Sequence, residues 1–157
     1  MSPEFSDKIK KQVLDIIVRY PEKKAALLPV LHVAQWEFGF IGEDTERMVA
    51  DLLDIKPVQV REVVTFYTMY NRQPVGKYHI QVCSNLSCSL LGGENLLDFL
   101  LKKLNIGVGE TTKDKKFTIS TVECLGACEQ APCMMVNFDY FGDLDEEKIN
   151  KILDNLN

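Results

Sequence analysis

The sequence predicts an α+β protein, with a small helical bundle in its first half and a sheet covered by helices in its second. In residues 1–74, apolar side chains recur at helical spacing in four successive segments. In residues 75–157, alternating segments typical of strands are interleaved with helical ones. All five cysteines of the 157-residue chain lie in this second half. We therefore predict two domains, 1–74 and 75–157, with different roles.

The first domain is predicted to contain four short helices. They cover residues 7–19, 24–38, 43–53 and 56–70. Pro21 ends the first helix, Gly39 is suited to the left-handed position after the second, and Pro57 lies in the first turn of the fourth. Each helix has one apolar stripe, so the four should pack into a bundle.

Two of these helices have the lengths of a helix-turn-helix motif, which raises the question of DNA binding. The charge argues against it, because the chain carries a net charge of −5 and nucleic-acid affinity comes largely from clustered lysine and arginine. The second helix of the pair carries one arginine, Arg61, beside Glu62. We expect no nucleic-acid partner.

The second domain is predicted to follow the order β-α-β-β-α. The strands cover residues 77–82, 117–123 and 133–138, and the helices cover 94–104 and 146–156. A strand, a crossover helix and a second strand should form a right-handed parallel pair, to which the third strand adds in antiparallel orientation. This is most of a thioredoxin-like layer structure.

The cysteines form two close pairs with C-x4-C and C-x3-C spacing. Cys83 and Cys88 follow the first predicted strand, and Cys124 and Cys128 follow the second, with Cys133 a little further on. Four thiolates at the ends of neighbouring strands suit either zinc or an iron–sulfur cluster. Structural zinc favours shorter C-x2-C spacing, so the spacing alone favours iron–sulfur over zinc without deciding between them.

Together with neighbouring residues, these cysteines carry a resemblance to a known family. The segments 82–88, 109–112, 122–128, 131–132 and 135–137 (VCSNLSC, GETT, VECLGAC, AP and MVN) are similar to the thioredoxin-like [2Fe–2S] ferredoxin family. The similarity extends into the helical half at Tyr20-Pro21, 28–31, Gln35, 39–41 and 64–67, so it covers nearly the whole chain.

The resemblance implies a cofactor, its ligands and a host complex. Cys83, Cys88, Cys124 and Cys128 would be the four ligands of one [2Fe–2S] cluster on a thioredoxin-like domain. The chain would be an electron-transfer subunit of NADH:quinone oxidoreductase without a hydride-transfer site. It would lie beside a flavin-bearing, NADH-oxidising subunit that holds FMN and NADH, together with further iron–sulfur subunits. Similar modules occur in NAD-linked hydrogenases and formate dehydrogenases, which remain alternative hosts.

Two segments depart from the pattern of this family. Cys133 stands where the family usually has an aliphatic residue. It is either a spare thiol near the cluster or a small buried apolar side chain, and we favour the second interpretation. Asp114-Lys115-Lys116 stands where the family often has Asp-Gly, and we interpret it as a modified turn without functional consequence.

Two other functional classes are alternatives. A thiol oxidoreductase would use C-x-x-C at the start of a helix, and the sequence contains no C-x-x-C. A zinc-stabilised interaction module differs from the first hypothesis only in the bound metal. No apolar stretch reaches the roughly 20 residues of a membrane span, and the first residues lack the features of a signal peptide. We expect a cytoplasmic protein without direct membrane insertion, with attachment to the inner face of the membrane through its complex as an open alternative.

Overall fold

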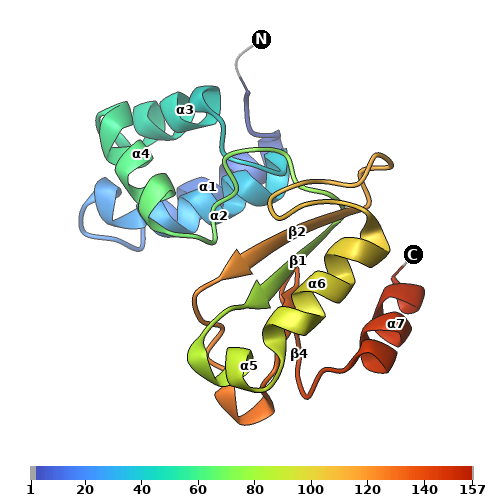
Figure 1. Ribbon diagram of the computed structural model, residues 1–157. Coiled ribbons are helices and arrows are strands. Elements are labelled where there is room, and N and C mark those ends of the chain that lie inside the picture. The colour runs from blue at the N-terminus through green and yellow to red at the C-terminus, as the bar shows by residue number, and fades with distance from the viewer. Residues whose placement is uncertain (1–2, 157) are drawn as a thin grey trace. The chain divides into compact units, whose positions relative to one another are not determined.

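The computed structural model describes residues 3–156, and these form two compact units that meet in sequence between Pro74 and Val75 (Figure 1). In the first unit the described elements are α1 (Asp7–Ile17), η1 (Lys23–Ala26), α2 (Leu27–Phe38), α3 (Glu43–Leu53) and α4 (Pro57–Phe66). Each α-helix contacts the next along the chain. Their apolar stripes enclose one core, in which Val13, Val30, Leu31, Val49 and Val60 are fully buried. The predicted helical bundle is confirmed.

Some predicted helix ends were wrong by a few residues. α1 ends at Ile17 instead of Arg19, and the 3-10 turn η1 takes the place of the first residues of the helix predicted over 24–38. Gly39 does end α2, with φ of 81°. Glycine suits this position because a side chain strains a left-handed backbone.

The fourth helix ends at Phe66 rather than at Tyr70, because side-chain contacts hold the next segment in another conformation. The Gln35 amide nitrogen donates to the Met69 carbonyl at 2.8 Å, and its oxygen accepts from the Asn71 N–H at 2.6 Å. These two bonds satisfy backbone groups that a longer helix would have paired internally. The sequence pattern could not show them, because Gln35 lies more than 30 residues away.

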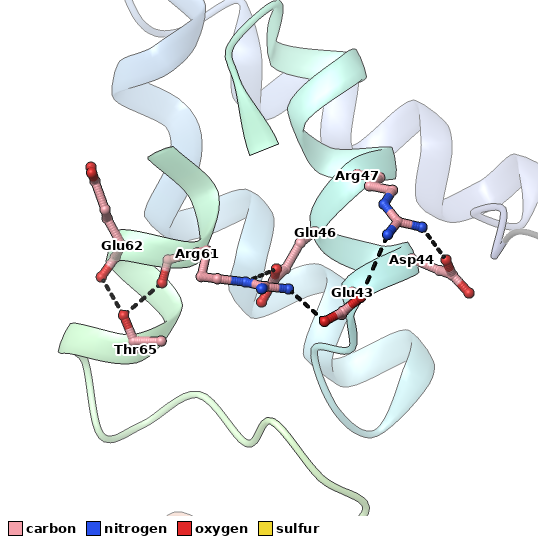
Figure 2. Close-up of polar contacts among 7 residues, drawn as sticks. All are labelled: Glu43, Asp44, Glu46, Arg47, Arg61, Glu62 and Thr65. Carbon is pink, nitrogen blue, oxygen red and sulfur yellow. Dashed lines mark hydrogen bonds and ion pairs between the residues drawn. The ribbon is translucent and has the colours of Figure 1, made fainter. Parts of the chain in front are cut away.

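The charged side chains of α3 and α4 pair across the two helices (Figure 2). The guanidinium of Arg61 lies 2.8 Å from a Glu46 oxygen and 3.0 Å from a Glu43 oxygen. The Glu46 side chain is almost fully buried, so this ion pair compensates a charge that would be costly to bury alone. Arg61, the one basic residue of α4, thus faces the carboxylates of α3.

The second unit is a four-stranded mixed sheet with helices. Its described elements are β1 (Tyr78–Cys83), α5 (Leu86–Leu90), α6 (Gly93–Leu104), β2 (Phe117–Val122), η2 (Cys128–Gln130), β3 (Met134–Val136), β4 (Asp139–Phe141) and α7 (Glu146–Asn155). The strand order is β2-β1-β3-β4, with β1 parallel to β2, and with β3 antiparallel to both β1 and β4. α6 contacts β1 and α7, and it crosses one face of the sheet in Figure 1. The predicted α+β class and the parallel pair are confirmed.

Three elements of this unit were missed: β4, α5 and the 3-10 helix η2. The strand predicted over 133–138 is a hairpin, in which β3 ends at Val136 and β4 begins at Asp139. Asn137 makes the turn with φ of 55°, and its side-chain oxygen accepts from the His79 N–H at 2.9 Å. The short helix α5 was also missed, because five residues are too few to show helical spacing.

Lys115 lies in the turn before β2, and it offers a test of backbone strain. Its φ is 59°, a left-handed value that costs a residue with a side chain roughly 1–2 kcal/mol. Because glycine avoids this cost but is more flexible when unfolded, we expect Lys115→Gly to raise the free energy of unfolding by about 0.5–1 kcal/mol. Equilibrium urea unfolding measures the change. Lys113→Gly, in the same loop without a left-handed backbone, should not stabilise; equal gains from both would contradict the explanation.

His79 on β1 should make stability depend on pH. Its Nε2 lies 2.8 Å from the Ser120 hydroxyl, and burial lowers its pKa below the usual value. The unfolded chain therefore binds a proton more readily, so the free energy of unfolding should fall as pH drops below about 6.5. In urea unfolding between about pH 7.5 and pH 5.5, His79→Gln should show a smaller loss than the unsubstituted protein. Identical pH slopes would show that His79 does not cause the loss.

Candidate metal centre

The sheet brings the two cysteine pairs to one edge. In the parallel register of β1 and β2, Cys83 lies opposite Val122, the last residue of β2. The Ser84 N–H extends this pairing by donating to the Val122 carbonyl at 2.9 Å. Cys124 follows Val122 by two residues, so the loops that carry both pairs leave the sheet at neighbouring points. This is the convergence that the order of strands predicted.

The helix α5 returns the chain toward the end of β1 and holds Cys88 in the interior. Cys83 and Cys88 are both buried, and their sulfur atoms lie within 4.8 Å of each other. Gly93, the first residue of α6, passes so close that an added Cβ would lie 2.8 Å from the Cys88 carbonyl oxygen. Any residue larger than glycine at position 93 would therefore displace α5.

The second pair lies on the loop after β2, and both of its cysteines are exposed. The Gly126 N–H donates to the Cys124 sulfur at 3.3 Å, and Gly126 has a left-handed φ of 72°. Cys128 is the first residue of η2. Loop residues Leu125, Ala127 and Ala131 pack against the buried cysteines, so this loop covers the pair from β1 and α5.

Cys133 is buried, as predicted, but it does more than fill space. Its sulfur lies 3.7 Å from that of Cys88, and the sulfurs of Cys83, Cys88 and Cys133 all lie within 4.8 Å of one another. We call these residues the three-thiol group. Of the four predicted ligands, the structure gathers Cys83 and Cys88 here, whereas Cys124 and Cys128 are not members of the group.

The surroundings of the three-thiol group affect each thiol differently. Burial acts to raise the pKa of Cys83, but hydrogen bonds from the N–H groups of Asn85 and Leu125, together with those from the Cys88 and Cys133 thiols, outweigh it and lower the pKa. Burial raises the pKa of Cys88. Burial and the neighbouring Cys88 raise the pKa of Cys133 to about 12. Cys83 is thus the buried thiol best prepared to become a thiolate.

The donor chemistry of this region fits an iron–sulfur cluster. All five cysteines are free, and thiolates are the ligands that iron–sulfur clusters and zinc prefer. N–H groups of Asn85, Leu125 and Gly126 point at sulfur atoms, the kind of hydrogen bonding that tunes such centres. Within the described residues, the only gathered set of metal-ligating side chains is the three-thiol group.

Comparison with known proteins identifies the class to which this fold and site belong. The family model described as thioredoxin-like [2Fe-2S] ferredoxin matches residues 13–157, so the chain belongs to this family. The chain is similar to the NADH-quinone oxidoreductase subunit designated E 2 in Rhizobium meliloti (strain 1021), with 43% identity over 93% of this chain and 87% of that protein. It is also similar to the E-type NADH-quinone oxidoreductase subunit of Rickettsia prowazekii (strain Madrid E), with 46% identity over 88% of this chain and 80% of the relative.

Among solved structures, the fold is similar to a chain of an NAD+-reducing [NiFe]-hydrogenase in its air-oxidized state, with a TM-score of 0.72. The match covers 83% of this chain but 22% of the hydrogenase chain, at 21% sequence identity. At this identity the similarity shows a shared fold. Separately, the helices between residues 3 and 156 include none with the length and apolar character of a membrane span.

Proposed function

We propose that this chain binds one [2Fe–2S] cluster through Cys83, Cys88, Cys124 and Cys128 and transfers single electrons as a subunit of an NADH:quinone oxidoreductase. The observation that carries the proposal is the parallel register of β1 and β2, which starts both cysteine loops at one edge of the sheet. One close pair would serve each iron, as a four-cysteine [2Fe–2S] site requires.

When bound, such a cluster accepts and releases one electron at a time. The chain's own residues set the conditions for this. N–H groups of Leu125 and Gly126 donate to ligand sulfurs and should raise the reduction potential, whereas the exposed carboxylates of Glu123 and Glu129 should lower it. The apolar side chain of Leu125 shields the buried ligands from water.

The proposed partner is a flavin-bearing, NADH-oxidising subunit that holds FMN and NADH, next to further iron–sulfur subunits. Support comes from relatives at 43% and 46% identity that are named as subunits of NADH-quinone oxidoreductase. An NAD-linked hydrogenase remains the alternative host, supported only by the shared fold. In an NADH:quinone oxidoreductase, the chain would lie on the cytoplasmic side of the membrane, attached through its protein partners.

Spectroscopy of the anaerobically purified protein tests the cofactor. We expect visible absorption bands that bleach with dithionite, and a rhombic electron paramagnetic resonance signal after reduction. A colourless protein with stoichiometric zinc would contradict the electron-transfer function and favour a zinc-stabilised interaction module. Purification from native cells tests the host, because a flavoprotein should accompany the chain.

A further inference from the structure

The position of Cys133 is set by the sheet rather than by a loop. β3 pairs with β1 so that Met134 lies opposite Val82, and the next pair in this register is Cys133 opposite Cys83. The pairing of the two strands extends to these residues, because the Cys83 N–H donates to the Cys133 carbonyl at 3.2 Å. Directly opposed residues in such a pair have neighbouring side chains. The Cys133 thiol is therefore held beside the buried ligands by backbone pairing.

The spacing of the Cys133 and Cys88 sulfurs matches that of two ligands on one metal. Their separation is 3.7 Å. Thiolates bound about 2.3 Å from a tetrahedral metal lie about 3.8 Å apart. Both residues are only 1% exposed, and the Cys133 N–H also points at the Cys88 sulfur. A metal bound by Cys88 would thus have a second thiol within reach without any rearrangement of the sheet.

We propose that Cys133 is a reserve ligand, which takes the place of Cys88 on the same iron when Cys88 cannot bind. This rests on the proposed [2Fe–2S] site. The exchange is a ligand substitution: the Cys133 thiol releases its proton to solvent and its thiolate forms the iron–sulfur bond that Cys88 would have formed. No electron is transferred, and the ligand set remains four cysteines. Cys128 is exposed, and among residues 3–156 it belongs to no gathered set of metal-ligating side chains, so we expect no such substitute for it.

The test compares single and double variants of the full chain after anaerobic reconstitution with iron and sulfide. Cys88→Ala should keep about two irons per chain and a reduced-state electron paramagnetic resonance signal close to that of the unsubstituted protein. The double variant Cys88→Ala/Cys133→Ala should lose about tenfold in iron content. Cys128→Ala, with Cys133 intact, should lose a similar amount. Circular dichroism of the iron-free chains checks that all variants fold.

The outcomes separate this inference from the function on which it rests. If the unsubstituted protein binds zinc and no iron, the proposed function and the reserve ligand are both overturned. If the unsubstituted protein is loaded but Cys88→Ala is empty, only the reserve ligand is overturned. The same conclusion follows if Cys88→Ala and the double variant hold equal iron, because the substitute ligand is then not Cys133. Iron lost only in the double variant, and kept in both Cys88→Ala and Cys133→Ala, supports the proposal, whereas loss in Cys133→Ala alone would make Cys133 an ordinary ligand and overturn it.

Discussion

Cys124→Ala is expected to purify with almost no iron–sulfur cluster. The variant removes one of four proposed thiolate ligands on the exposed loop after β2, where the three-thiol group offers no replacement. Loss of even an outer partner of a metal ligand weakens binding by about 10–100-fold, and loss of a direct ligand should weaken it at least as much. Iron analysis should show a fall from about two irons per chain to below about 0.2. Visible absorption should fall in parallel.

The exposure of Cys124 makes this result easy to interpret. Its side chain is exposed and accepts a hydrogen bond from the Gly126 N–H, so alanine there should leave the iron-free fold intact. Glu123→Ala is the matched control, because Glu123 is the adjacent exposed residue. It should retain about two irons per chain and shift the reduction potential upward, since a nearby negative charge is removed. Full iron content in Cys124→Ala would exclude Cys124 as a ligand.

Much of the fold could be predicted from local patterns in the sequence. Apolar spacing gave the helices of the first unit, and the order of strands and helices gave the parallel pair β1 and β2. Differences arose where distant contacts decide the local conformation. α4 ends at Phe66 because Gln35 holds the segment that follows, and β3 ends early because Asn137 adopts a left-handed turn. Neither the hydrogen bonds of Gln35 nor the turn at Asn137 changes the spacing of apolar residues in the sequence, so the pattern could not show them.

The candidate site, like the fold, could be predicted only in part from the sequence. Convergence of the two cysteine loops follows from strand order, so the region of the site was predictable. The packing of Cys133 against Cys88 was not, because it depends on the pairing of β1 with β3, whose members are about 50 residues apart in sequence. The signal available was Cys133 itself, a fifth cysteine close to the second cysteine pair. The burial of Cys133 was predicted, but its contact with Cys88 could be found only from the register of β1 and β3.

Leu100→Ala is expected to cause a large loss of stability. Leu100 on α6 is fully buried in the core that joins the helices to the sheet, together with Ile80, Ile119 and Ile149. Removing a fully buried leucine side chain costs about 2–5 kcal/mol, because apolar burial is lost and a cavity remains. A domain of this size is stable by about 5–15 kcal/mol, so the loss is a large fraction of the total. Equilibrium urea unfolding should report it as a lower midpoint with an unchanged slope.

The same substitution should also loosen the candidate site. α6 begins at Gly93, which packs on the Cys88 backbone, and the strand β1 that α6 contacts ends at Cys83. Local opening of this helix would expose the buried ligands, so a chelator should remove iron faster from Leu100→Ala than from the unsubstituted protein. Lys103→Ala, at an exposed position of the same helix, should change stability by no more than about 0.5 kcal/mol and leave the rate of iron loss unchanged. If Leu100→Ala lost stability without faster iron loss, the sheet and its cysteine loops would hold the ligands independently of α6.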